Sequence, residues 1–288
     1  MSQTATLDLE ELEERVLEKE EEGQHMAAEI LATAAIKEAR AVQNGSAEVP
    51  VPLLHSLEVR GGLRMRAGEI EPAREDFLEA LSLLDGREKQ DGMLGRLHVC
   101  LGCLNEEEEK DGEAIEAYEK ALGHFEKDEE TEVEDVVRLS NNLAFLYAGR
   151  DEFDQAETLF LKALKLAHEE LGASSEETTG VCNNVGALYQ KSGHLSEAQE
   201  MHLLALEGRK ECFGANHPDT AQSHGNLAVV LAELGEDEDA REHFEAALGI
   251  YQSLGEDEGE DYQSVASNYA QYLRLQGEGE AASTIEVA

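Results

Sequence analysis

Residues 138–165, RLSNNLAFLYAGRDEFDQAETLFLKALK, contain two apolar stripes separated by a short break. In the first half the apolar residues are spaced i, i+3 and i+4, which places them on one helical face: Leu143, Leu146 and Tyr147. In the second half small and large residues share a face in the same way: Ala156, Phe160, Ala163 and Leu164. The pattern predicts a helix, a tight turn over 149–154 and a second helix.

The same layout recurs along the chain at a constant step of 42 residues. An Asn followed by an apolar and a small residue marks the first helices: Asn142-Leu143-Ala144, Asn184-Val185-Gly186, Asn226-Leu227-Ala228 and Asn268-Tyr269-Ala270. An Ala marks the second helices: Ala114, Ala156, Ala198, Ala240 and Ala282. A fixed period of this length is typical of stacked repeats. We therefore expect an all-α fold, an α-solenoid forming a right-handed superhelix of six to seven helix-turn-helix units.

The spacing of small and aromatic residues resembles that of tetratricopeptide repeats. Their usual period is 34 residues, and the extra residues here lie between units, at 171–180 and 213–222. The second of these linkers, with His217-Pro218-Asp219, is similar to the linker of kinesin light chain-type repeats, as is NNLAFLY at 141–147. The resemblance is strong over 94–278 and weaker over 1–93. It does not imply a motor light chain, because residues 8–22 supply only about two heptads.

The regularity of the repeats suggests four parts. We expect a degenerate acidic helix pair over 1–45, a divergent unit over 46–93, four regular units over 94–260, and a capping helix with a truncated unit over 261–288. Terminal repeats need a polar outer face. The chain is therefore expected to be a monomer, with a dimer through the C-terminal end as the alternative if that cap is insufficient.

The chain is strongly acidic, with 64 Asp and Glu against 23 Lys and Arg and a net charge of −41. This balance argues against binding nucleic acid or an anionic membrane surface, both of which attract basic proteins. A solvated shell, adaptation to salt or a basic protein partner would each explain it. The first residues, MSQTATLDLEELEE, do not resemble a signal peptide, and no apolar run approaches a membrane helix. A cytoplasmic setting is the expectation.

Residues typical of catalysis or metal binding are sparse. The sequence His98-Val-Cys100-Leu-Gly-Cys103 is the one metal-like cluster, and a single C-x2-C is better explained as helix packing. His202 stands at the aromatic position of its repeat, which predicts a core residue. There is no phosphate-binding GxxxxGK loop. We expect no enzyme activity, no metal and no cofactor.

The first helices hold few charges. Four equivalent windows together carry a charge of +3: 138–150, 180–192, 222–234 and 264–276. The resemblance implies that first helices line the concave face. The windows therefore predict a neutral-to-basic groove inside an acidic shell, which favours a peptide with mixed apolar and acidic residues.

The repeated asparagines are the main candidates for binding. Asn is a mediocre helix former, roughly 0.6 kcal/mol worse than Ala, yet its amide can both donate to and accept from a peptide backbone. The resemblance implies this role, and an inter-helix hydrogen bond or inheritance from a duplicated unit is the alternative. The candidate peptide-binding residues are Asn141, Asn142, Asn183, Asn184, Asn226, Asn268, Phe145, Arg138, Lys191 and Arg274.

These candidates predict a non-enzymatic adaptor that binds an extended peptide in its groove. Phe145 would supply an apolar floor, while the cations are too dispersed for a clamp on a terminal carboxylate. The partner class is protein or peptide. The alternative is an acidic holdase, a chaperone for basic client proteins.

Overall fold

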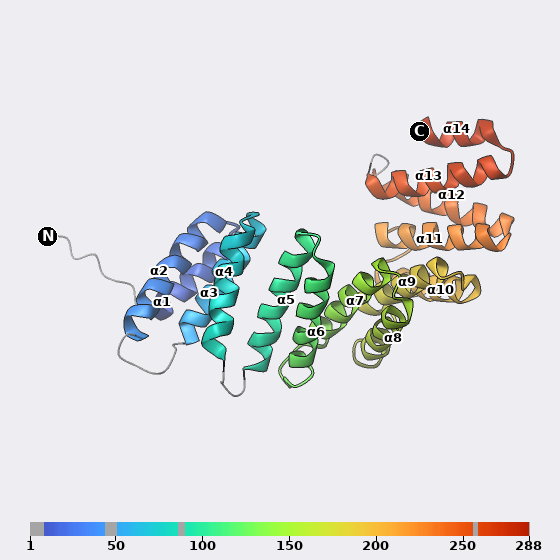
Figure 1. The fold of residues 1–288 in the computed structure, drawn as a ribbon. Coiled ribbons are helices and arrows are strands. Elements are labelled where there is room, and N and C mark those ends of the chain that lie inside the picture. Colours follow the sequence, from blue (N-terminus) through green and yellow to red (C-terminus); the bar gives the residue numbers. More distant parts are fainter. Residues whose placement is uncertain (1–8, 44–50, 86–89, 256–258, 288) are drawn as a thin grey trace. The chain divides into compact units, whose positions relative to one another are not determined.

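The computed structural model describes residues 9–43, 51–85, 90–255 and 259–287. Within these ranges the chain forms 14 α-helices and no strand, so the expected all-α fold is confirmed. Consecutive helices pack as hairpins joined by short turns, and the described residues contain seven such pairs (Figure 1). Within each of the two compact units described next, neighbouring pairs stack on one another, as the α-solenoid prediction requires. The break expected near residue 45 lies outside the described residues.

The chain divides into two compact units, unit 1 (Met1–Thr131) and unit 2 (Glu132–Ala288). Unit 1 contains the pairs α1 (Leu9–Glu21) with α2 (His25–Gln43), α3 (Val51–Arg66) with α4 (Ile70–Leu84), and α5 (Asp91–Glu107) with α6 (Asp111–Phe125). Unit 2 contains α7 (Val133–Gly149) with α8 (Phe153–Glu170), α9 (Glu176–Lys191) with α10 (Leu195–Cys212), α11 (Pro218–Leu234) with α12 (Asp237–Leu254), and α13 (Glu260–Leu275) with α14 (Gly279–Val287). The odd-numbered helices are called first helices and the even-numbered ones second helices.

The repeated small residues lie where helices approach most closely. All five alanines that mark the second helices are completely buried: Ala114, Ala156, Ala198, Ala240 and Ala282. The aromatic residues that follow them are also buried, including Tyr118, Phe160 and Phe244. An alanine permits a short interhelical distance and the aromatic ring fills the space beside it. This alternation forms the core of each pair.

The turn within each pair needs a residue with a left-handed backbone. In the pairs α9–α10 and α11–α12 this residue is glycine, with φ of 84° at Gly193 and 79° at Gly235. The pair α7–α8 uses Asp151 instead, with φ of 60°. A side chain costs about 1 kcal/mol or more in this conformation. Asp151 offsets part of this cost because its carboxylate lies 3.1 Å from the Lys191 ammonium of the next repeat.

Unit 1 contains a buried ionic cluster that the sequence pattern did not predict. Arg60 and Arg64, at positions of α3 where apolar residues would be expected, both bind Asp76 of α4. The Asp76 carboxylate is 2.5 Å from Arg60 Nη2 and 2.9 Å from Arg64 Nη1, and the residue is only 2% exposed. At these positions, therefore, the divergent sequence of this pair forms buried ion pairs in place of apolar contacts.

Candidate functional site

Asparagine amides join consecutive first helices of unit 2. Asn184 Nδ2 on α9 donates to Asn141 Oδ1 on α7 at 2.8 Å. One repeat further on, Asn226 Nδ2 on α11 donates to Asn183 Oδ1 on α9 at 2.7 Å. The four residues are half-buried, and we call them the asparagine ladder. The inter-helix hydrogen bond considered as the alternative for these asparagines is thus present at two of the four repeated positions.

The ladder uses only part of each amide's hydrogen-bonding capacity. A side-chain amide has two N–H donors and an oxygen with two lone pairs. After the bonds within the ladder, Asn184 and Asn226 each keep one N–H and the carbonyl oxygen, while Asn141 and Asn183 keep their NH2 groups. The ladder therefore fixes the orientation of amide groups that can still bond to another chain.

The ladder ends at α11 for a steric reason. Asn268 on α13 would need a partner at position 225, where the chain has a glycine without a side chain. A Cβ atom at Gly225 would lie 2.7 Å from Cγ2 of Val265, so α11 and α13 approach too closely for an asparagine there. Asn268 is instead exposed. Asn142, one residue after Asn141 on α7, is half-buried.

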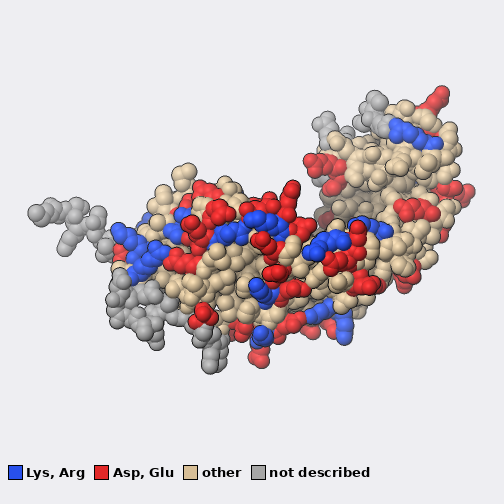
Figure 2. Space-filling model, viewed as in Figure 1, with Lys and Arg blue, Asp and Glu red and all other residues tan. Residues whose placement is uncertain are grey.

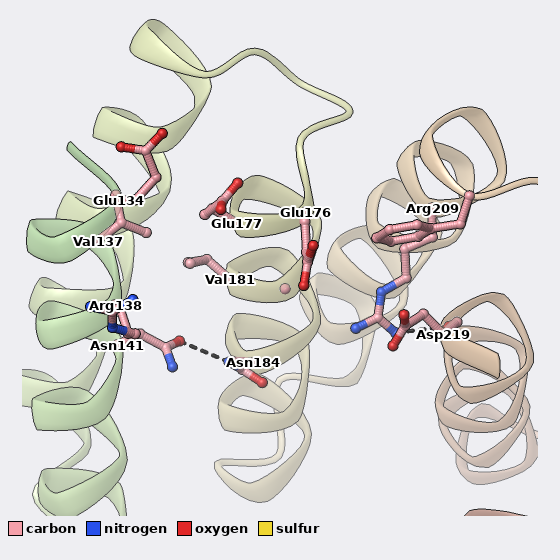
Figure 3. A pocket seen from close by; sticks show the side chains of 12 residues that line it. Glu134, Val137, Arg138, Asn141, Glu176, Glu177, Val181, Asn184, Arg209 and Asp219 are labelled. Atoms are coloured by element: carbon pink, nitrogen blue, oxygen red, sulfur yellow. Dashed lines mark hydrogen bonds between the residues drawn. The ribbon is translucent and has the colours of Figure 1, made fainter. Parts of the chain in front are cut away.

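A cleft of about 350 Å³ lies beside the first bond of the ladder. Figure 3 shows the Asn141–Asn184 bond crossing from α7 to α9 at one end of the space, with side chains of both helices extending along it. The C-terminal end of α10 and the start of α11 contribute the remaining wall. The lining includes Glu134, Val137, Arg138, Asn141, Glu176, Glu177, Val181, Asn184, Arg209 and Asp219.

The charge of this cleft corrects the prediction of a neutral-to-basic groove. Four carboxylates line it against two guanidinium groups. Arg138 pairs with Asp135 one turn away on its own helix. Arg209 donates hydrogen bonds to polar groups of α11. The sequence windows used to count charge, 138–150 and 180–192, begin after the first turns of α7 and α9. Those first turns hold Glu134, Glu176 and Glu177. Acidic residues favour helix N-termini because of the helix dipole, so the cleft is acidic at its N-terminal end.

Arg209 is a cleft residue that the sequence argument missed. Its guanidinium Nη1 donates to the backbone oxygen of Asp219 at 2.8 Å, to Gln222 Oε1 at 3.0 Å and to Ser223 Oγ at 3.0 Å. The residue is 7% exposed, and burial lowers the pKa of its guanidinium. The sequence did contain a sign of this role. The positions equivalent to Arg209 in the neighbouring repeats hold Ala167 and Tyr251, and both of these residues are buried. An arginine at a core position indicates a special polar environment.

The other predicted residues lie apart from this cleft. Lys191 Nζ donates to the Ala148 carbonyl at 2.9 Å and stands 5.3 Å from the Phe153 ring centre, so it ties α9 to the end of α7. Phe145 is 48% exposed and meets the Phe160 ring edge to face, with ring centres 5.4 Å apart. Arg274 is exposed in the last turn of α13. Of the predicted cations, only Arg138 lines the cleft with asparagines of the ladder.

The charged surface around the units is predominantly acidic. Figure 2 shows carboxylate side chains spread over the viewed face of both units, with lysines and arginines among them. Many of these cations form ion pairs with neighbouring carboxylates, as Arg96 does with Glu58 at 2.6 Å. Among the residues whose exposure is described, Asp76 and Arg209 are the buried carboxylate and cation, so the excess of negative charge lies at the surface there.

The histidine and cysteine residues of the metal-like cluster act as packing groups. The His98 ring stacks on His124 with centres 5.8 Å apart, and burial lowers the pKa of His98 to about 4. Burial raises the pKa of the Cys100 thiol to about 12. Among the described residues no group of three or more His, Cys, Asp or Glu side chains has an arrangement suited to a metal ion. Nor does any described helix combine the length and the apolar character needed to span a membrane.

This arrangement is that of a helix-pair solenoid with a polar, amide-bearing cleft on its first helices. The tetratricopeptide repeat family model matches residues 135–211 and 180–253. Residues 135–253 are therefore tetratricopeptide repeats, and repeats of this kind form scaffolds for protein–protein interaction. The search of curated proteins gave no match to the sequence.

Solved structures extend the similarity beyond the matched repeats. BtubC (BKLC) from P. vanneervenii has 27% identity and a TM-score of 0.67, covering 79% of this chain and 91% of its own. Repeats of a putative kinesin light chain from Podosopora anserina have 16% identity and a TM-score of 0.60, covering 70% and 96%. YrrB, a TPR protein with an unusual peptide-binding site, has 18% identity and a TM-score of 0.50, covering 73% and 91%. The resemblance to kinesin light chain-like repeats is thus confirmed.

Proposed function

We propose that the protein is a non-enzymatic adaptor and that the first helices of unit 2 bind an extended peptide segment. The observation that carries the proposal is the asparagine ladder beside the cleft. It holds amide donors and acceptors in fixed orientation along α7, α9 and α11. The similarity in fold to YrrB, which is described as having a peptide-binding site, supports the same class of partner.

The peptide is held mainly through its backbone. An extended chain offers alternating N–H and C=O groups, and the uncommitted amide groups of the ladder match both kinds. Each hydrogen bond contributes roughly 1 kcal/mol net. The bonds within the ladder reduce the entropy lost on binding, because the amides are oriented before the peptide arrives. Phe145, exposed one turn after the asparagines of α7, adds an apolar contact beyond the cleft.

The preferred peptide carries a basic side chain at the cleft. Glu134 of α7 and Glu177 of α9 line the space between those two helices, while Glu176 of α9 and Asp219 of α11 lie on the side of the cleft toward Arg209 (Figure 3). A lysine or arginine seated there would be attracted by all four carboxylates. This preference replaces the mixed apolar and acidic peptide expected from the sequence windows.

A random peptide display library selected on the full chain tests the proposal. We expect enriched peptides to contain Lys or Arg and to bind a Glu134→Gln, Glu177→Gln double variant at least ~10-fold more weakly. The Asn141→Ala, Asn184→Ala double variant should weaken binding to a similar extent. Glu238→Gln, at an exposed position of α12, is the matched control and should leave the affinity unchanged.

Two outcomes would contradict this function. Peptides that bind the ladder variant and the wild-type chain equally would remove the asparagines from the site. Holdase activity toward basic client proteins, the alternative drawn from net charge, would appear as binding that ignores peptide sequence. Such binding would also weaken steeply as salt screens the acidic surface.

A further inference from the structure

A second cleft of unit 2 lies between the second helices α8 and α10. Its volume is about 490 Å³, within the roughly 300–1,000 Å³ of typical ligand clefts. Leu161 and Leu164 of α8 form one wall and Leu204 of α10 forms the other. Thr178 and Cys182 of α9, both buried, also line the space. This cleft shares no residue with the cleft beside the asparagine ladder.

The leucines of this cleft are unusually exposed for their size. Leu161 is 41% exposed, Leu204 is 47% exposed, and the neighbouring Leu203 is 40% exposed. On the next second helix, α12, the positions equivalent to Leu203 and Leu204 hold Glu245 and Ala246. Exposed aliphatic side chains add nothing to the core of a repeat, so leucines clustered at two adjacent second helices indicate a contact surface.

The charged residues at the cleft are acidic in excess. Glu169, Glu207 and Glu211 line it, against Lys165 and His168. Lys165 Nζ is 4.0 Å from Glu169 Oε1, so that lysine is partly compensated within its own helix. The leucines Leu161 and Leu204 precede these charged groups along α8 and α10. The cleft therefore runs from an apolar end to an acidic end.

The periodicity of the lining residues matches a helical occupant. On α8 the cleft residues Leu161, Leu164, Lys165 and His168 stand at i, i+3, i+4 and i+7. On α10 the residues Leu204, Glu207, Gly208 and Glu211 have the same spacing. Each stripe covers two turns, or about 10 Å of helix. The groove between two such stripes is the surface onto which a third helix packs.

The chemistry of the walls favours a helix over an extended peptide. An extended segment would need partners for its backbone N–H and C=O groups. The lining is mainly aliphatic and charged, and its two hydroxyl groups, on Ser174 and Thr178, already form hydrogen bonds with neighbouring side chains. A helix satisfies its own backbone and presents only side chains. We propose that the α8–α10 cleft binds an amphipathic helix of a partner protein, with an apolar stripe against Leu161 and Leu204 and basic residues against Glu207 and Glu211.

A display library of helical peptides about 18 residues long, randomised on one face, tests this proposal. The full chain serves as bait, and a Leu161→Gln, Leu204→Gln double variant serves for counter-selection. We expect enriched peptides with apolar residues at i, i+3, i+4 and i+7 and with Lys or Arg toward one end. Their affinity for the double variant should fall at least ~10-fold, and for Glu207→Gln, Glu211→Gln about 3-fold or more.

Two controls make the result specific. Leu275→Gln removes an 81% exposed leucine of α13 and should leave the affinity unchanged. The Asn141→Ala, Asn184→Ala variant should also bind these helices normally, which separates this cleft from the proposed peptide site. The proposal is overturned if no enriched peptide distinguishes the wild-type chain from the leucine variant while both unfold at the same temperature. Enrichment of peptides with acidic residues, or with helix-breaking proline, on the randomised face would overturn it equally.

Discussion

At the scale of single residues, His202 departs from the chemistry of the other repeats. It stands at the position of Phe160 and Phe244 and is 1% exposed. Neither of its ring nitrogens has a hydrogen-bond partner among the described residues. Gly186 leaves room for the ring, because a Cβ atom there would lie 2.7 Å from it. Burial lowers the pKa of His202 to about 4, so the ring is neutral near pH 7.

We expect His202→Phe to raise the free energy of unfolding by roughly 1–3 kcal/mol, because two unsatisfied polar atoms leave the core. The folded pKa lies below the unfolded value of about 6.5. The unfolded chain therefore binds the proton first, and His202 lowers stability as pH falls from about 6.5 to about 4. The variant should lose this part of the pH dependence. Thermal unfolding between pH 4 and pH 7 measures it, and an unchanged slope would contradict the assignment.

Unit 1 has a different buried polar residue, Asp76, whose carboxylate pairs with two arginines. Asp76→Ala should lower the free energy of unfolding by about 3–5 kcal/mol, because it leaves the guanidinium groups without their buried partner. Glu75→Ala, at an exposed neighbour on α4, should change it by less than about 0.5 kcal/mol. Denaturant unfolding of both variants makes the comparison, and equal stabilities would show that the ionic cluster is dispensable.

At the scale of elements, the asparagine ladder is a contact between first helices as well as a candidate binding surface. Asn268→Ala should stabilise the chain by about 0.5 kcal/mol, because this exposed position gains helix propensity and loses no ladder bond. Asn141→Ala gains the same propensity but leaves Asn184 without its acceptor. It should therefore be about 1 kcal/mol less stable than Asn268→Ala. Equal stabilities in denaturant unfolding would mean that the ladder bond contributes nothing.

The helices also show which structural features could be predicted from the sequence and which could not. The 42-residue recurrence and the apolar spacing predicted helix pairs with buried alanines, because those features depend on contacts within one repeat. The ladder depends on register between repeats, and its bonds join positions 43 apart, such as Asn141 and Asn184. Aligning equivalent positions at a step of 42 therefore could not pair them. The partner of Arg60 was not predicted for a different reason: Asp76 lies within the same pair, but on the facing helix α4, and the apolar spacing does not show which charged side chains meet there.

The acidic character of the cleft could not be predicted because it depends on where the helices begin. The charge comparison used windows that begin four residues before each repeated asparagine, whereas Glu134, Glu176 and Glu177 lie in the first turns of α7 and α9. Those turns could not be assigned to the cleft without knowing where each first helix begins. The identities of the side chains were sufficient to predict the core, whereas predicting the site also required the positions of the helix ends.

At the scale of the whole molecule, the net charge of −41 should make stability depend on salt. Repulsion among surface carboxylates disfavours the compact state, and raising salt from about 0.1 M to 1 M shortens the screening length from about 10 Å to about 3 Å. We expect the unfolding temperature to rise by several degrees, about 5 °C or more, between these KCl concentrations. Scanning calorimetry at a series of KCl concentrations measures the change. A flat response to KCl would contradict this effect of the acidic shell.

In the proposed complex, side-chain amides of the first helices contact the bound peptide. Nuclear magnetic resonance of the full chain can follow the side-chain NH2 signals of Asn141, Asn183, Asn184 and Asn226 as a selected basic peptide is added. We expect these signals to shift together and to saturate at the affinity measured for the peptide, while the Asn216 signal on the linker before α11 stays unchanged. Saturable binding that leaves all four ladder signals in place would contradict it.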